Sequence, residues 1–393
     1  MSGRAGATQL IMATILAMAA NRSSPAADWS ETLDANINTA YDINPQLLPG
    51  SRMTDQSAQV IADGNTTMQT ELGQLVVTPR LSAVRYLRDT NLDVDTGSLN
   101  ASYVERLERG QWNVAGQTLT DSTVTSELGT TGITNVNFRH YLDSVSAGYQ
   151  YSETERLGWQ LAGSWQNTRY NAEAQHYGLT DYDYDSVQLG PAWSFSELLV
   201  GSLSLGADRI TSQFAPTEKD YSARLQLKRS LSERYAWRAS IGGTRVESGS
   251  GASGSSSLFE MGATRQGERV QWDLSVKRSV LPIGLGLLAR EDAAALTAAA
   301  STSERSTISI SFNAIRSYPV TAIFNIAPGI SLGLPVYSGA SWGQATAEWQ
   351  YHFSPNWAMS VAYSQSRART DNVPQWANGN QARLGIVWQS SRL

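Results

Sequence analysis

Apolar and polar residues alternate along most of the chain from about residue 98 onward, in stretches that end at short polar turns. The clearest stretch sets Val270, Trp272, Leu274 and Val276 against Gln271, Asp273, Ser275 and Lys277. A period of two places the apolar side chains on one face of a β-strand and the polar ones on the other. Turns such as Gly267–Arg269 and Ser303–Arg305 are about 36 residues apart. One repeat is therefore two strands, a tight turn and a longer loop.

The N-terminal third is less regular and leaves the strand count open. Trp29–Tyr41 alternates and predicts the first strand, whereas the polar segment Asn44–Thr67 predicts an external loop. Leu72–Thr78 and Ser82–Arg88 predict two strands interrupted near Pro79. Counting these two as a hairpin gives about 18 strands in the chain, and counting them as one long strand gives 16. Both numbers are even, as is usual for single-chain bacterial barrels.

Aromatic residues distinguish a membrane barrel from a soluble β-sandwich, since both show alternation. The large rings gather at strand ends beside the short turns, whereas mid-strand apolar residues are Ala, Leu, Val and Ile. A sandwich would concentrate its rings in the core, but a membrane barrel carries an aromatic girdle at the interface. The sequence therefore predicts an all-β, transmembrane antiparallel up-and-down β-barrel. The predicted girdle consists of Trp112, Tyr151, Trp159, Trp193, Trp237, Trp272, Phe353 and Trp357.

Residues 1–27 have the layout of a Sec-type signal peptide. Arg4 precedes an apolar run, Leu10–Ala20, and small residues follow it. The run is too short to span a membrane, and it is followed by a cleavage-like segment ending near Ala26 or Ala27. We therefore expect residues 28–393 to form a single outer-membrane barrel domain. That segment has 28 basic and 35 acidic side chains, a net charge of −7, which argues against a nucleic-acid partner.

The polar faces of the predicted strands would line a lumen that is wide enough for water and solutes at 18 strands. Charges of both signs occur there, so the sequence sets no ion preference. The predicted lumen-facing residues are Asp208, Arg224, Lys228, Arg238, Glu260, Asp273, Lys277 and Glu348. A channel is the first functional hypothesis, and a non-conducting scaffold or surface-interaction barrel is the alternative.

Residues suited to catalysis or metal binding are sparse. The chain has no Cys and three His, and none of the His lies in a metal-ligand spacing. We expect no enzyme activity, no cofactor and no metal. Two observations leave alternatives open. The acidic segment Asp181–Asp185 could bind Ca²⁺ through its carboxylates or simply face solvent or the lumen. His352 alternates with polar residues near a turn, which favours a lumen position.

Two segments in the C-terminal half fit the repeat poorly. Ala293–Ala300 is alanine-rich and is compatible with a short helix instead of a strand. Ser317–Ala340 contains three prolines among apolar residues and predicts a long loop. Its apolar content would be poorly placed in external water, so we expect it to fold inward and narrow the lumen, or to cap the rim.

The last alternating segment, Gln381–Gln389, resembles the C-terminal insertion signal of outer-membrane barrels. The resemblance rests on Gly385 and on the aromatic Trp388. The chain departs from that signal because it continues to Leu393 instead of ending on an aromatic residue.

Several motifs resemble the outer-membrane β-barrel porin family found in bacterial exopolysaccharide and exosortase gene neighbourhoods. They include Gly110–Gly116, Asp121–Thr123, Thr125–Leu128 and Arg278–Pro282 followed by Gly284 and Gly286. The resemblance implies a Gram-negative outer-membrane channel, exported through the Sec pathway, that passes polar or saccharide solutes for an export locus. The implied partners are outer-membrane lipid, lipopolysaccharide, the barrel assembly machinery and polysaccharide export components. The motifs are barrel motifs and transfer no functional residue.

Overall fold

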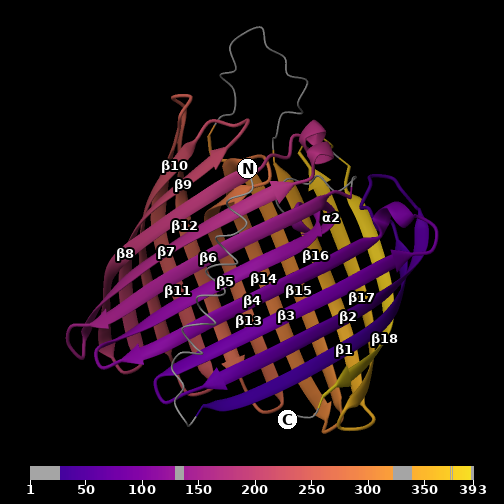
Figure 1. The fold of residues 1–393 in the computed structure, drawn as a ribbon, viewed down its shortest axis with the longest axis horizontal. Helices are drawn as coiled ribbons and strands as arrows, with labels where there is room; N and C mark the ends of the chain where they lie inside the picture. Colours follow the sequence, from indigo (N-terminus) through magenta and orange to yellow (C-terminus); the bar gives the residue numbers. More distant parts are fainter. Residues whose placement is uncertain (1–26, 129–136, 322–338, 372, 374, 391–393) are drawn as a thin grey trace.

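A computed structural model describes residues 27–128, 137–321, 339–371, 373 and 375–390. Within them, 18 antiparallel strands form one closed sheet in which each strand pairs with its chain neighbours and β1 pairs with β18 (Figure 1). The strands are β1 (Asp28–Ile43), β2 (Thr54–Gln69), β3 (Gly73–Tyr86), β4 (Val94–Leu107), β5 (Gly110–Ser122), β6 (Arg139–Ser152), β7 (Leu157–Tyr170), β8 (Tyr182–Ser196), β9 (Leu199–Ser212), β10 (Glu218–Ser230), β11 (Tyr235–Ser248), β12 (Ser253–Gln266), β13 (Val270–Ile283), β14 (Leu287–Ser303), β15 (Ser306–Pro319), β16 (Ala340–His352), β17 (Trp357–Thr370) and β18 (Ala377–Gln389). The predicted up-and-down barrel is therefore confirmed.

Short helical turns are confined to the connections. They are η1 (Thr90–Leu92), α2 (Thr123–Ser126) and η2 (Ala172–Tyr177). No helix among the described residues is long and apolar enough to cross a membrane.

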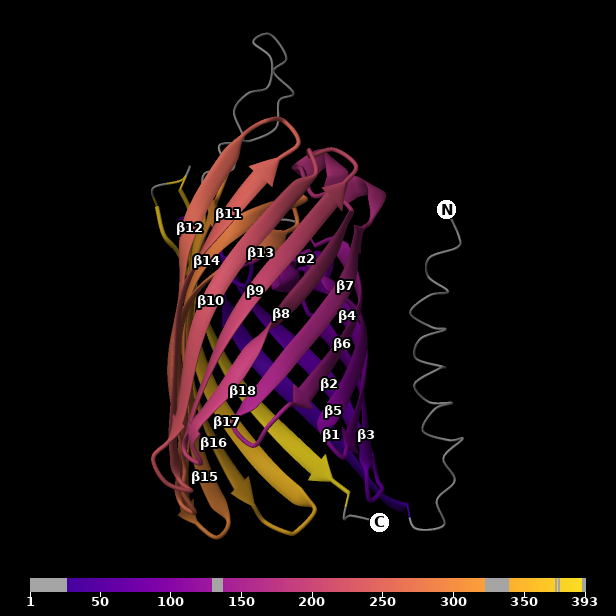
Figure 2. The same ribbon diagram turned by 90° about the vertical axis from the view of Figure 1, so that its left-hand side faces the viewer.

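The two ends of the barrel differ in how the strands are joined. Eight connections of two to four residues, from β2–β3 to β16–β17, lie at the end we call the turn end. The other connections, up to 20 residues long, lie at the loop end. Figure 2 shows the short turns along the lower edge, where β18 also ends.

The barrel is apolar outside and polar inside, which inverts a soluble protein. Large apolar side chains remain exposed on the outer face, for example Leu81, Ile241 and Met261 at 65–68%. Their neighbours in sequence point to the lumen and are mostly polar, because the side chains of a strand alternate between faces. Such an exterior is compatible with lipid, and closure leaves no unpaired sheet edge along the main wall.

Two sequence predictions about single elements were wrong, and one open alternative is decided. The segment Asn44–Thr67 is mostly strand β2, and most of the polar residues of this strand, such as Asp55, Gln59 and Asp63, face the lumen. Leu72–Thr78 and Ser82–Arg88 form the single strand β3, which continues through Pro79. Ala293–Ala300 is strand β14, not a helix. The first two errors cancel, so the count of 18 is right although its derivation was not.

Candidate pore and its constriction

The pairing register places the eight predicted lumen residues on the inner face. Arg224 and Lys228, for example, flank the outward-facing Leu225, which is 47% exposed. Two of the inner acids share one arginine. Arg238 Nε lies 2.6 Å from Glu260 Oε1, and Arg238 Nη1 lies 3.8 Å from Asp273 Oδ2.

Other inward charges complete a mixed inner wall. Lys277 Nζ lies 3.3 Å from Glu291 Oε1, and Arg383 Nη2 lies 3.2 Å from Glu348 Oε2. The sequence analysis did not select Glu291 or Arg383, although both sit at the same alternating positions as the residues that it did select. Arg224 and Lys228 have no ion-pair partner among the described residues, which leaves these cations available to solutes.

A polar pocket lies on the inner wall where β16, β17 and β18 meet. It has a volume of about 200 Å³ and is lined by Gln344, Thr346, Ala362, Ser364, Gln381 and Arg383. The side chains that line the pocket carry amide, hydroxyl and guanidinium groups. They come from three neighbouring strands. Such groups bind polar solutes through hydrogen bonds.

The β13–β14 hairpin leaves the barrel wall near the loop end. Hydrogen-bonded pairing of β12 with β13 stops at Phe259 and Arg278, whereas β13 and β14 stay paired as far as Ile283 and Leu287. We call residues 279–291 the hairpin tip. The tip reaches across to the β7–β8 connection, where the Thr180 N–H donates to the Gly284 carbonyl at 2.8 Å.

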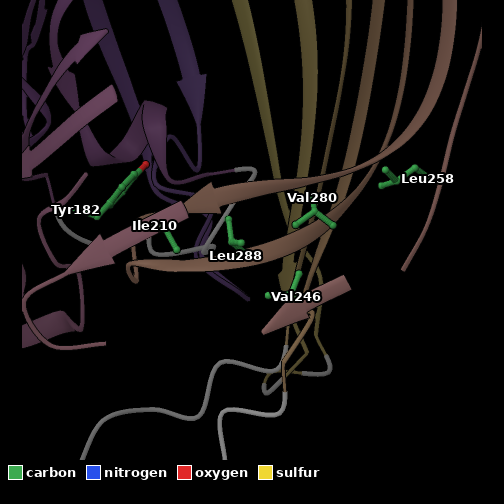
Figure 3. Close-up of a cluster of buried hydrophobic side chains, with 6 residues drawn as sticks. All are labelled: Tyr182, Ile210, Val246, Leu258, Val280 and Leu288. Carbon is green, nitrogen blue, oxygen red and sulfur yellow. The ribbon is translucent and has the colours of Figure 1, made fainter. Parts of the chain in front are cut away.

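An apolar cluster docks the hairpin tip on the inner wall. Figure 3 shows the tip residues Val280 and Leu288 with four residues from strands β8, β9, β11 and β12. The four wall residues are Tyr182, Ile210, Val246 and Leu258. They occupy inward positions. Val280 and Leu288 lie on the face of the tip that would point outward if the hairpin stayed in the barrel wall. This face packs on the inner side of the neighbouring strands. Leu288 is 1% exposed and Ile210 is fully buried, so water is excluded from this contact.

A buried carboxylate fixes the base of the tip. Glu218, on the inner face of β10, has no exposed surface. Its Oε2 accepts a hydrogen bond from the Leu288 N–H at 2.7 Å, and its Oε1 accepts one from the Thr321 hydroxyl at 2.6 Å. Hydrogen bonds to an ionised group are among the stronger ones in proteins. Glu218 therefore holds the tip and the beginning of the β15–β16 connection together.

Two glycines let the tip fit its dock. A Cβ at Gly284 would lie 2.6 Å from both Glu127 Oε1 and the Tyr170 hydroxyl, which are hydrogen bonded to each other at 2.5 Å. Gly286 has a φ of +71°, in the left-handed region that favours glycine. These are the glycines of the Arg278–Gly286 motif found in the sequence, and their role is to seat the tip.

The segment expected to fold inward, Ser317–Ala340, is only partly described. Its first residues, Ser317–Pro319, belong to β15, and Ala340 begins β16. Val320 packs against the apolar cluster, and Thr321 binds Glu218. Residues 322–338 lie outside the described residues, as does most of the predicted signal peptide. The inward element that the structure does describe is the hairpin tip, which the sequence analysis did not identify.

The predicted girdle residues lie at outward positions near the turn end. Trp112, Trp159 and Trp357 are each 43–44% exposed there, and Phe353 is 52% exposed. The other four, Tyr151, Trp193, Trp237 and Trp272, occupy outward register positions on β6, β8, β11 and β13. A second set of outward aromatics was missed, and it consists of Tyr41, Tyr141 and Tyr221 near the loop end and Tyr363 in the middle of β17. It escaped notice because each strand contributes one isolated ring.

The two residues of the predicted insertion signal lie on opposite faces of β18. Trp388 pairs with Trp357 on the outer face. Gly385 faces the lumen beside Asn38, and a Cβ there would overlap the side-chain amide oxygen of Asn38. The absence of a side chain at Gly385 therefore leaves room for the Asn38 side chain at the seam that closes the barrel.

His140 and two residues of the acidic segment take structural positions. His140 is 5% exposed, and its Nδ1 lies 2.6 Å from Asp121 Oδ1. Within the described residues, no hydroxyl nucleophile is hydrogen bonded to His140. The His140–Asp121 pair links β6 to β5. Asp181 accepts from the Tyr170 N–H at 2.8 Å, and Asp183 accepts from Asn167 at 2.9 Å.

No protein-family model matches the chain. No curated protein matches it. Among solved structures it is similar to three proteins of Pseudomonas aeruginosa, in each case over nearly the full length of both chains. OpdO is 10% identical, with 93% of this chain and 98% of that chain covered and a TM-score of 0.46. OpdL is 13% identical, with coverages of 93% and 99% and a TM-score of 0.44. OccK2 (OpdF), solved in complex with glucuronate, is 11% identical, with coverages of 92% and 98% and a TM-score of 0.44.

A function for the chain therefore has to be inferred from its own inner wall. In the part of the chain that the structure describes, that wall carries paired charges, cations such as Arg224 and Lys228 that have no ion-pair partner, a polar pocket on one side and an inward hairpin at the loop end.

Proposed function

We propose that the chain is an outer-membrane channel for small polar solutes, narrowed at the loop end by the hairpin tip. The observation that carries this proposal is the closed 18-stranded wall, apolar on its outer face and polar on its inner face. A barrel of this size encloses an aqueous lumen. Spanning the outer membrane in this way also requires export, for which the predicted Sec signal at residues 1–27 and the barrel assembly machinery are the proposed route.

We further propose saccharides as the first solutes to test. The sequence resemblance to porins of exopolysaccharide loci motivates this choice, and so does the pocket lined by Gln344, Thr346 and Gln381. Amide and hydroxyl groups hydrogen bond to sugar hydroxyls without requiring a charged solute. Partnership with polysaccharide export components remains a prediction on the same basis.

Single-channel recording of the purified protein in a planar bilayer tests the channel. The matched variant replaces Val280–Arg290 with an Asn-Gly turn, which favours a two-residue hairpin between β13 and β14. We expect the wild type to conduct and the trimmed variant to conduct more, because the inward tip is gone. Swelling of proteoliposomes in sugars of increasing size then measures which solutes pass.

A non-conducting scaffold is the second candidate, and the buried dock of the hairpin tip favours it. The tip and Val320 fill space inside the barrel near the loop end. If the tip closes the lumen completely, the wild type will be silent and only the trimmed variant will conduct. If neither protein conducts although both are folded in the membrane, the channel proposal is wrong.

A further inference from the structure

Three arginines gather on the outer face of neighbouring strands at the loop end, in the part of the barrel formed by β14–β17. Arg316 and Arg369 flank Ser341 in one cross-strand row. Neighbouring strands lie about 4.8 Å apart, so the two arginines start roughly 10 Å from each other. Arg367 is the next outward residue on β17, roughly 7 Å further toward the membrane. We call Arg316, Arg367 and Arg369, together with the rings of Tyr318 and Trp376, the basic patch.

Aromatic rings hold two of these guanidinium groups in place. Arg316 Cζ lies 4.4 Å from the centre of the Tyr318 ring, and Arg290 Cζ lies 4.6 Å from the same ring. Arg369 Cζ lies 5.0 Å from the centre of the Trp376 ring, and Trp376 itself is 42% exposed. Stacking on a ring restricts a flexible arginine, so less conformational entropy is lost when it binds an anion.

Acids neutralise only one of the three arginines of this surface. Asp292 lies opposite Arg316 in the register, but both of its oxygens bind Arg278, at 2.5 and 2.9 Å. Asp371 Oδ1 is 3.8 Å from Arg369 Nη2. Arg316 and Arg367 are exposed and have no acidic partner among the described residues.

Several outward arginines elsewhere at the loop end are paired. Arg85 Nη2 lies 2.7 Å from Asp95 Oδ1, Arg169 Nη2 lies 2.8 Å from Asp143 Oδ2, and Arg245 Nε lies 3.1 Å from Glu247 Oε1. The basic patch differs from these pairs because it groups three outward arginines on neighbouring strands, in a chain whose net charge is −5.

We propose that the basic patch binds the phosphate groups of an outer-leaflet glycolipid, that is, of lipopolysaccharide. The patch lies on the lipid side of the wall, beyond Tyr363 toward the loop end, where headgroups meet the barrel. Arginine is suited to phosphate because its planar fork donates two parallel hydrogen bonds. Trp376 and Tyr318 present ring faces beside the cations, on which sugar rings can stack. This inference rests on the proposed outer-membrane location with the long loops outside.

Binding of purified lipopolysaccharide to the full-length detergent-solubilised barrel tests the proposal. The test variant is R316Q/R367Q. The matched control is R169Q/R245Q, which removes two outward arginines at the same end that are paired with Asp143 and Glu247. A basic residue near an anionic membrane surface contributes about fivefold to binding, so we expect roughly 25-fold weaker binding for the test variant. The control should stay within about threefold of wild type.

Two further measurements define the ligand. Dephosphorylated lipopolysaccharide should bind the wild type as weakly as intact lipopolysaccharide binds R316Q/R367Q. Inorganic phosphate should compete only at far higher concentration, and equal competition would mean a site for free phosphate, which overturns the glycolipid assignment. Equal binding of the test variant and wild type overturns the patch.

Conductance separates this proposal from the channel proposal. R316Q/R367Q should conduct like the wild type, because neither arginine faces the lumen. Wild-type protein that conducts but does not bind lipopolysaccharide overturns the patch alone, whereas protein that binds but is silent supports the patch and overturns the channel.

Discussion

Substitution of Leu288 by Ala should release the hairpin tip. The Leu288 side chain is 1% exposed and packs against wall residues including Ile210 and Val246. Truncating a buried leucine costs about 2–4 kcal/mol, from lost burial and from the cavity left behind. The docked state bears this cost, since an undocked tip exposes the leucine anyway. A factor of ten corresponds to about 1.4 kcal/mol, so the docking equilibrium should shift by roughly 30- to 1,000-fold.

Two assays should detect the release. In single-channel recordings, L288A should make excursions to the higher conductance of the trimmed variant. Thiol labelling gives a second readout, because the chain has no cysteine and an I210C thiol would lie beneath the tip. Labelling of I210C should accelerate when L288A is added.

The matched control is L274A, on the neighbouring strand β13 and 44% exposed on the outer face. It removes the same atoms without touching the dock. If L288A and L274A behave alike while the trimmed variant conducts more, the apolar cluster does not hold the tip. If the trimmed variant also conducts like the wild type, the tip is not the constriction.

Four further outcomes are expected. Arginine at the lipid-facing Leu225 should cost about 2–4 kcal/mol in a refolding titration, whereas arginine at the lumen-facing Gln226 should be mild, and equal costs would invert the assignment of faces. E218Q should weaken the attachment of the tip to β10, since an uncharged acceptor binds the Leu288 N–H less strongly. Conductance noise should therefore rise without loss of folded protein. Deleting Asn380–Leu393 should prevent assembly by leaving two open sheet edges in lipid, and a truncated protein that kept heat-modifiable mobility would contradict this. N-terminal sequencing of the exported protein should begin just after Ala26 or Ala27, and a sequence starting at Met1 would rule out cleavage.

The barrel class could be predicted from the sequence because its main determinant is local. Alternation with a period of two fixes which side chains face lipid, and a soluble core cannot use the same pattern with its rings at strand ends. The eight lumen residues follow from that parity alone. The errors occurred where apolar and polar residues do not alternate clearly. In β2 the outward residues include Thr54, Gln56 and Thr66, so the strand looks polar on both faces.

The inward docking of the hairpin tip could not be predicted, because it depends on contacts between distant strands. The motif Arg278–Gly286 was noticed in the sequence, but nothing local shows that β13 leaves β12 after Arg278. The apolar residues that receive the tip, such as Ile210 and Val246, occupy inward positions. In sequence they look like irregularities in the alternation. Only the folded structure shows that they pack against Val280 and Leu288 of the hairpin tip.

The parting of β12 and β13 above Phe259 and Arg278 also has a mechanical consequence. A strand within a closed barrel is clamped by hydrogen bonds on both sides, so the wall is stiff. Among the described residues, Ser279–Ile283 of β13 pair on one side only, with β14. Bending there strains side-chain packing but breaks no ladder between β12 and β13. The hairpin tip is thus more easily bent than the barrel wall. The size of a few buried side chains can change the stiffness of the tip while the wall stays unchanged.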